Sequence, residues 1–339
     1  MTRLLSAAAP ADIEAVAALL QDGGIAALPT ETVYGLAGDA LNPTAVQAIY
    51  AAKGRPADNP LIVHIAGPDD LSALARKIPS AARLLAERFW PGPLSIVFPR
   101  QPHVPDVVTA GLDTVAVRVP AHPAFLDVLR AGGRPLAAPS ANRAGSPSST
   151  TAAHVLHDLD GLIPAVLDGG PCTVGVESTV IDLTNKPCLL RPGGVPLEAL
   201  REVLGEIAVH PAVSGELAAN AQPGAPGMKY RHYSPTANVI VVDGDVQHAA
   251  EYLGWVGTGE SAVLCPAEEA ACFSGQRVVT YGSLTDPATL ARGLFDALRT
   301  LDTPDVTHIY ARCPLDETGI SRAVRNRLLK AAAFQTVTV

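Results

Sequence analysis

Aromatic residues and charges are scarce in this 339-residue sequence: Phe, Trp and Tyr make up 4%, and Asp, Glu, Lys and Arg 17%. Alanine, valine and leucine must therefore fill the cores that a 48% hydrophobic chain can form. The net charge of −8 argues against a general nucleic-acid binder, because such binding draws on surplus lysine and arginine. Any phosphate site in this chain must be local.

The five cysteines share no CxxC spacing; they are Cys172, Cys188, Cys265, Cys272 and Cys313. Their odd number indicates free thiols in a reducing compartment. No apolar run of about twenty residues occurs, so we expect no membrane span. The first residues lack the basic start and long apolar stretch of a signal peptide, and Asp12 and Glu14 interrupt them. They predict a helix start, and we expect a cytoplasmic protein.

Familiar nucleotide and hydrolase motifs are also missing. The sequence contains no GxxxxGK[ST] and no GxSxG. Residues 257–262 fit GxGxxA but precede an expected strand, which argues against a dinucleotide site. His154 and His157 lie three residues apart on an expected helix and lack a clear third ligand, so an exposed helix face explains them better than a metal site.

Apolar runs of strand length alternate with helical patterns, which predicts an α/β protein. The first expected strands are 25–28, 61–65, 94–98, 114–119, 135–138, 165–168, 178–183 and 188–191. The first expected helices are 12–22, 44–53, 69–76, 79–89, 123–131, 151–158 and 196–204. The chain length favours two domains, and we assign residues 1–207 to the first.

Residues 208–236 are rich in proline, glycine and alanine and predict a linker. The basic and aromatic cluster PGMKYRHYSP in its second half indicates a segment that rests on something. Beyond it, expected strands lie at 238–242, 262–265, 277–281 and 306–311, and expected helices near 246–254, 266–272, 286–302 and 319–332. This alternation predicts a small doubly wound sheet over residues 237–339.

Polar side chains gather at strand ends between residues 28 and 64. The apolar strand that ends at Leu28 opens into PTETVY, and the segment KGRPADNPLIVH follows further along the chain. Hydroxyls, an amide, an imidazole and two cations are the groups that hold a small polar molecule beside an anion.

Four cations lie at the ends or in the middle of expected elements: Lys53, Arg55, Arg118 and Arg191. Helix C-capping alone explains the first two, which flank Gly54. In TVAVRVP the valines share one face of a strand and Arg118 the other. An arginine there needs a buried anionic partner, either a local carboxylate or a bound anion. The four together predict one shared anion pocket.

Two turns offer further hydroxyl and amide groups. APSANRAGSPSST, residues 138–150, precedes an expected helix, and its backbone N–H groups can cradle phosphate. N-capping by Ser149 or Thr150 accounts for one of its hydroxyls. GVESTVIDL, residues 175–183, places Glu177 and Ser178 just before a strand.

Eight motifs occur in one order along the chain: PTETVYGL, KxR (Lys53 and Arg55), NPLIVH, AVRVP, PSAN, ESTV, LRPG and KYRHYSP. Together they resemble the YrdC-like family, specifically its longer members, the L-threonylcarbamoyladenylate synthases. The resemblance covers nearly the whole chain. It implies an α/β fold, with a twisted mixed sheet and helices around a concave pocket, followed by a small Rossmann-like C-terminal domain whose role stays open.

The resemblance also implies a nucleotidyltransferase reaction. Threonine's amine takes up bicarbonate or CO2 as a carbamate, and the carbamate oxygen attacks the α-phosphorus of ATP to give threonylcarbamoyl-AMP and pyrophosphate. The implied partners are ATP, L-threonine and bicarbonate, with Mg²⁺ accompanying ATP and no dedicated protein metal site. A separate complex then transfers the group to tRNA. No membrane is involved, and direct tRNA binding stays open.

Site residues follow from the same resemblance. Lys53 and Arg55 are implied to act nearest the reacting phosphate and carbamate. The residues implied for L-threonine are Thr32, His64, Arg118, Ala138 and Ser178. Those implied for ATP are Arg55, Asn59, Thr114, Ser140, Ser148, Arg191, Tyr230 and His232. The linker, through Tyr230, His232 and Tyr233, is expected to close over the site. The residue types suit the reaction, because adenylyl transfer needs positioning and cations.

Two other functions compete with this interpretation. One is a module that grips double-stranded RNA on a basic surface, which the acidic composition disfavours. The other is a carbamoyl-handling domain like those of hydrogenase maturation factors. Those chains carry zinc-finger cysteines, which are not visible here.

Overall fold

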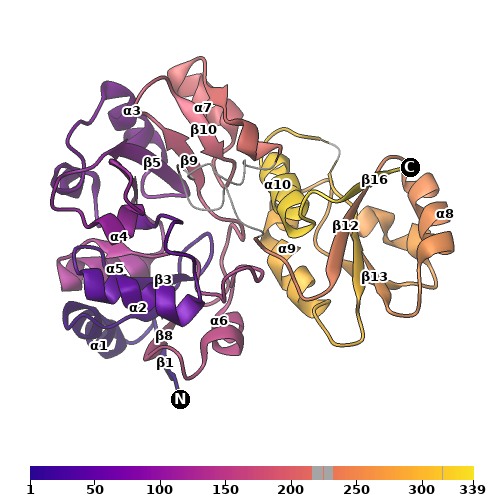
Figure 1. Ribbon diagram of the computed structural model, residues 1–339, viewed down its shortest axis with the longest axis horizontal. Coiled ribbons are helices and arrows are strands. Elements are labelled where there is room, and N and C mark those ends of the chain that lie inside the picture. The colour runs from indigo at the N-terminus through magenta and orange to yellow at the C-terminus, as the bar shows by residue number, and fades with distance from the viewer. Residues whose placement is uncertain (216–223, 225–231, 315) are drawn as a thin grey trace. The chain divides into compact units, whose positions relative to one another are not determined.

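The computed structural model describes residues 1–215, 224, 232–314 and 316–339. It divides into two compact units (Figure 1), of which the first comprises residues 1–144, 148–173 and 177–229. The second comprises residues 230–339 together with two short segments, 145–147 and 174–176, that come from within the predicted first domain.

A mixed sheet runs through the first unit in the order β1-β8-β2-β3-β7-β4-β6-β5-β9-β10-β11. Its strands are β1 (Arg3–Ser6), β2 (Ala26–Leu28), β3 (Gly35–Asp39), β4 (Ile62–His64), β5 (Leu94–Pro99), β6 (Thr114–Arg118), β7 (Leu136–Ala137), β8 (Ala165–Asp168), β9 (Thr179–Asp182), β10 (Cys188–Arg191) and β11 (Ala208–Val209). Parallel pairs such as β4–β6 alternate with antiparallel pairs such as β5–β6, so the expected mixed α/β fold is confirmed.

Helices cover this sheet. They are α1 (Pro10–Gln21), α2 (Pro43–Lys53), α3 (Ser80–Phe89), α4 (Asp106–Thr109), α5 (Pro123–Gly132), α6 (Ala152–Leu159) and α7 (Leu197–Leu204), with 3-10 turns η1 (Pro68–Ala73) and η2 (Pro211–Val213). The helix α2 starts as the sequence indicates, because the Asn42 side chain accepts hydrogen bonds from two backbone N–H groups and Pro43 follows.

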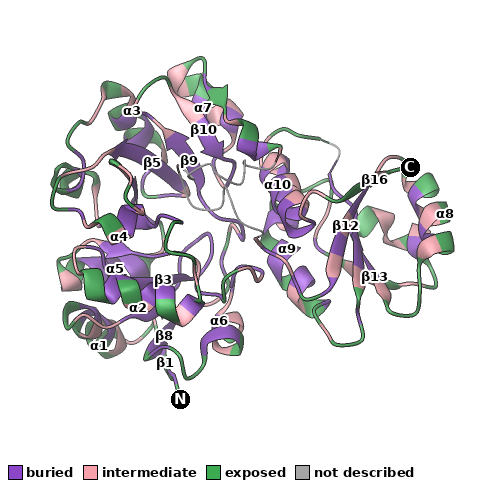
Figure 2. Cartoon of the chain, viewed as in Figure 1, coloured by how far each residue is buried: buried purple, intermediate pink, exposed green. Residues whose placement is uncertain are grey.

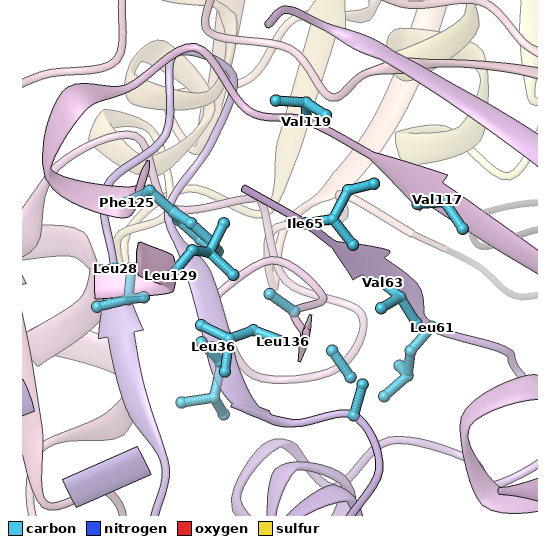
Figure 3. Close-up of a cluster of buried hydrophobic side chains, with 14 of the residues drawn as sticks. Leu28, Leu36, Leu61, Val63, Ile65, Val117, Val119, Phe125, Leu129 and Leu136 are labelled. Carbon is cyan, nitrogen blue, oxygen red and sulfur yellow. The ribbon is translucent and has the colours of Figure 1, made fainter. Parts of the chain in front are cut away.

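Alternate side chains of the strand β6 belong to two different apolar clusters. Val115, Val117 and Val119 belong to the main core, part of which Figure 3 shows around Leu36, Phe125 and Leu136. On the other face, Ala116 packs in a smaller cluster. Figure 2 shows how consistently the central strands are buried. The face of Ala116 also carries Arg118, so the expected division of β6 is confirmed.

The second unit contains a parallel sheet in the order β14-β13-β15-β12-β16. Its strands are β12 (Asn238–Asp243), β13 (Ser261–Cys265), β14 (Arg277–Thr280), β15 (His308–Ala311) and β16 (Thr336–Thr338). Its helices are α8 (Val246–Val256), α9 (Pro287–Thr300) and α10 (Ser321–Ala331), with the 3-10 turn η3 (Ala267–Phe273). Helices α9 and α10 lie on one face and α8 on the other (Figure 1), as in a doubly wound sheet.

Four strands were not predicted, namely β1, β3, β11 and β16. The strand β3 reads GLAGD and has none of the β-branched residues that mark strands. Its glycines serve close packing, since a Cβ on Gly38 would lie 3.2 Å from side-chain atoms of Ile25 and Ile49. The first residues, expected to start a helix, instead form β1 on the edge of the sheet. Where a helix was expected at 69–76, Pro68–Ala73 form a 3-10 turn.

All five cysteines are free thiols, as their spacing indicates. No helix among the described residues has the length and apolar character needed to cross a bilayer.

Replacing Gly254 by alanine should stabilise the second unit. Gly254 is an exposed residue inside α8, and an added Cβ would have no neighbour within 4 Å. Alanine loses less backbone entropy in a helix, so we expect the free energy of unfolding to rise by about 0.5–1 kcal/mol in urea titrations. The control is Gly275→Ala, which also has open space but a φ of +88°; it should lower stability by about 1–2 kcal/mol. Equal effects of the two substitutions would contradict this account.

Candidate functional site

The loop between β2 and β3 is folded around the hydroxyl of Thr30. That hydroxyl donates to the Val33 carbonyl at 2.7 Å and accepts from the backbone N–H groups of Thr32 and Val33. The Thr30 and Thr32 hydroxyl oxygens lie 2.7 Å apart. This local turn explains why PTET follows the strand directly, because threonine hydroxyls satisfy backbone groups that leave the sheet.

Arg118, at the end of β6, reaches this loop. Its Nη1 donates to Thr32 Oγ1 at 3.0 Å and its Nη2 to Glu31 Oε1 at 2.6 Å, while its Nε donates to the Gly92 carbonyl. The guanidinium is 4% exposed and Glu31 8%. The requirement of a buried arginine for an anionic partner is therefore met by a carboxylate of the chain itself.

His64 lies beside Arg118, because β4 pairs in parallel with β6 and the register opposes these two residues. Its ring packs against Phe125, with ring centres 5.1 Å apart. Burial, and then the positive charge of Arg118, lower the pKa of His64 to about 3. Its Nδ1 is buried and has no hydrogen-bond partner in the described part of the chain. The imidazole is thus neutral at physiological pH and suited to hydrogen bonding rather than proton transfer. Ala138 is next to the same strand, since its N–H donates to the Ile62 carbonyl.

Ser178 directly precedes β9 and Arg191 ends β10, and the two residues are in contact. Arg191 donates through Nε and Nη2 to the Ser178 carbonyl, at 3.1 and 3.0 Å, and Nη2 lies 3.2 Å from Ser178 Oγ. The Ser178 hydroxyl also contacts the hydroxyl of Ser95 at 2.8 Å. Gly193 permits this turn, because a Cβ there would lie 2.3 Å from the Glu177 carbonyl oxygen.

Lys53 holds the turn that follows β7. Its Nζ donates to the carbonyls of Ser140 and Asn142, both at 2.5 Å, and the residue is 3% exposed. Burial, and then the charge of Arg55, keep the pKa of Lys53 well below its usual range. Capping of α2 is carried out instead by Gly54 in the left-handed conformation. Helix capping, the simplest explanation of Lys53, is therefore not its role.

Arg55 and Asn59 form a compact turn close to Lys53. Arg55 donates to the carbonyls of Asn59 and Pro60 through Nε and Nη2, at 3.3 and 3.0 Å. Asn59 is 1% exposed. Its Oδ1 is buried without a hydrogen-bond partner among the residues that the structure describes. Such an atom is available to a ligand.

Ser148, 1% exposed, donates to Glu177 Oε1 at 2.5 Å. The same carboxylate raises the pKa of Lys53, so Ser148, Glu177 and Lys53 are within electrostatic reach of one another. The expected cap of the next helix is wrong by one residue. Thr151, not Ser149 or Thr150, accepts the hydrogen bond from the His154 N–H at the start of α6.

The remaining predicted residues lie elsewhere. Thr114 begins β6 and Arg118 ends it, so they are about 13 Å apart along the strand. Tyr230 lies outside the described residues. In the second unit, the His232 ring lies beside Tyr233, with centres 5.6 Å apart. Tyr233 is 5% exposed and packs on Phe295, with ring centres 5.3 Å apart.

Sequence reasoning assigned no role to Glu31, Ser95 or Glu177, which contact Arg118, Ser178 and Ser148. A signal existed for Glu31, because a buried arginine demands a carboxylate, but the sequence does not say which one. Across the described ranges, no three His, Cys, Asp or Glu side chains are grouped so as to hold a metal ion.

Two family models match consecutive parts of the chain. Residues 18–193 match the Sua5/YciO/YrdC family, described as "Telomere recombination", and residues 195–333 match the family described as "Threonylcarbamoyl-AMP synthase, C-terminal domain". The chain thus has the domain composition of the long Sua5-type proteins. It belongs to the threonylcarbamoyl-AMP synthase family.

Relatives of known name cover nearly the full length. A threonylcarbamoyl-AMP synthase of Pyrococcus abyssi is 47% identical over 96% of each chain. One of Bacillus subtilis is 45% identical over 96% of this chain and 94% of its own. The crystal structure of P. abyssi Sua5 complexed with L-threonine superposes with a TM-score of 0.91 at 44% identity, covering 100% of this chain and 99% of that one.

Acid should destabilise the first unit through His64. The folded-state pKa of about 3 lies below the ordinary value of 6.5, so the unfolded chain binds the proton first as pH falls. The free energy of unfolding should therefore drop by up to about 1.4 kcal/mol per pH unit between pH 6.5 and 3. Urea titrations at several pH values across this range should show that the free energy of unfolding of His64→Gln falls less per pH unit than that of the wild type. The exposed His103 provides the control, since His103→Gln should keep the wild-type slope. An unchanged slope in His64→Gln would contradict a neutral buried imidazole.

Proposed function

We propose that this chain is a threonylcarbamoyl-AMP synthase that condenses L-threonine, bicarbonate or CO2 and ATP. The observation that carries this is the 47% identity to a synthase of that name over 96% of each chain. The alignment covers 96% of the relative's own length, so the proposal extends to the whole reaction. The first unit adds buried cations beside hydroxyls and carbonyls, which is the environment that adenylyl transfer requires.

The threonine end of the site is formed around Arg118. Its guanidinium binds the α-carboxylate of threonine, as arginine does with planar anions. Thr32, the neutral His64, the Ala138 backbone and Ser178 bind the remaining polar groups. P. abyssi Sua5, whose structure contains L-threonine, supports threonine as the amino acid. Because these groups are buried, bound substrate is shielded from water, and the labile carbamate persists.

The nucleotide end lies around Lys53 and Arg55. Adenylyl transfer places negative charge on the α-phosphate and on the departing pyrophosphate, and fixed cations stabilise that charge. Asn59, Thr114, Ser140, Ser148 and Arg191 bind the nucleotide, and the assignment of Tyr230 and His232 to ATP stays a prediction from the resemblance. The charge of Arg55 acts on Lys53, so placing the two cations together costs free energy. A bound phosphate would offset that cost. Mg²⁺ would accompany ATP and screen the charge of the triphosphate.

The product is a mixed anhydride, so a transferase complex acting on tRNA must consume it. We infer a cytoplasmic site for this step, where ATP, threonine and tRNA are all available. The alternative of a double-stranded RNA-binding module has no support from relatives, and the net charge of −8 disfavours it.

Pyrophosphate release tests the proposed reaction directly. Purified protein with ATP and Mg²⁺ should release pyrophosphate only when both L-threonine and bicarbonate are present, because the carbamate is the nucleophile. A coupled pyrophosphate assay measures this. Release without threonine would contradict the proposal, and steep salt-dependent binding of duplex RNA without turnover would favour the alternative.

Substitutions of two buried arginines should affect the binding of L-threonine and of ATP differently. Arg118→Ala should weaken L-threonine binding by about 1.5–3 kcal/mol and ATP binding less, because a charge-assisted hydrogen bond to the carboxylate is lost. Arg191→Ala is the matched variant, since Arg191 is 5% exposed and is assigned to ATP. Titration calorimetry with each ligand measures both. Equal losses for both ligands in Arg118→Ala would reject its role as the carboxylate clamp.

A further inference from the structure

Glu31 is a buried carboxylate to which the proposed function assigns no task. It lies in the loop between β2 and β3 and is 8% exposed. Its Oε1 accepts from Arg118 Nη2 at 2.6 Å and its Oε2 from the backbone N–H of Ala121 at 3.1 Å. Because each oxygen accepts from a different residue, the carboxylate is held in one orientation.

The hydrogen bonds that Arg118 makes within the described part of the chain leave two of its N–H groups unused. A guanidinium carries five N–H donors. Three are used by the Gly92 carbonyl, Thr32 Oγ1 and Glu31 Oε1. In the described part of the chain no further acceptor contacts Arg118, so one N–H on Nη1 and one on Nη2 remain. Two N–H groups are what a carboxylate needs for a bidentate contact.

The hydroxyls next to Arg118 are engaged within the loop. The Thr30 hydroxyl donates to the Val33 carbonyl, and its oxygen lies 2.7 Å from the Thr32 hydroxyl oxygen, a contact in which either hydroxyl can be the donor. Thr32 Oγ1 accepts from Arg118 Nη1, so this hydroxyl holds the guanidinium in place beside Glu31.

We propose that Glu31 is a positioning residue that orients Arg118, so that the two remaining N–H groups of the guanidinium bind the carboxylate of the amino-acid substrate. The inference rests on the proposed function and deepens it. Glu31 itself does not touch the substrate. It acts through the 2.6 Å contact with Nη2, while Thr32 and the Gly92 carbonyl fix the other two nitrogens.

A role of Glu31 in charge balance and a role in positioning Arg118 predict opposite changes in threonine binding. Its negative charge opposes the binding of an anion beside it, so a role in charge balance alone means that removing the charge tightens threonine binding. A positioning role means that removing the contact loosens it, since a misdirected guanidinium loses the bidentate geometry. The sign of the change therefore discriminates between the two roles.

The experiment uses Glu31→Gln in the full-length chain and two probes, L-threonine and L-threoninol, which lacks the carboxylate. Calorimetry on the protein bound to a non-hydrolysable ATP analogue gives both Kd values. We expect threonine binding to weaken at least tenfold and threoninol binding to change less than twofold. In the double variant Glu31→Gln/Arg118→Ala, kcat/KM for threonine should equal that of Arg118→Ala within about twofold, because both changes remove one interaction.

A matched buried carboxylate serves as control. Glu177 is 7% exposed and accepts from Ser148, so Glu177→Gln should raise the KM for ATP and keep the preference for threonine over threoninol. If Glu31→Gln fails to fold, Glu31→Asp keeps the charge but shortens the reach, and it should also lose that preference. Tighter or unchanged threonine binding, or additive effects in the double variant, would overturn the inference. Failure of the wild type to bind threonine would instead overturn the proposed function.

Discussion

A buried positive charge is the constraint around which the first unit is arranged. Arg118 stands at the end of a strand in a sheet interior and is 4% exposed. An uncompensated charge at that depth would cost several kcal/mol. The loop that carries Thr30, Glu31 and Thr32 supplies the compensation, and the pairing of β4 with β6 brings His64 beside it. The polar groups are thus placed by strand register and by the cost of burying charge.

Much of the fold followed from alternation in the sequence. Valines on one side of β6 and Arg118 on the other predicted the two environments that the structure contains. The strand β3 was not predicted because Gly38 reflects close packing against Ile25 and Ile49 rather than strand propensity. The pairing order of the large sheet could not be predicted either, because β7 sits between β3 and β4. Only long-range contacts specify such an order.

The candidate site was predictable in its residue types and less so in their contacts. The sequence indicated that Arg118 needs an anion but not that Glu31 supplies it. Lys53 resembled a helix cap, yet its ammonium reaches two carbonyls of a turn nearly ninety positions away in the chain. The cap of α6 differed by one residue because several hydroxyls compete there, and Ser149 instead donates to the Ala141 carbonyl. Side-chain destinations depend on tertiary neighbours that a local pattern does not contain.

The most direct test of the central claim is a crystal structure with L-threonine and a non-hydrolysable ATP analogue bound together. The account predicts that the threonine carboxylate contacts Nη1 and Nη2 of Arg118, while Arg118 keeps its bond to Glu31, and that the α-phosphate lies against Lys53 and Arg55. Threonine bound away from Arg118, or phosphates bound at a different set of cations, would contradict it.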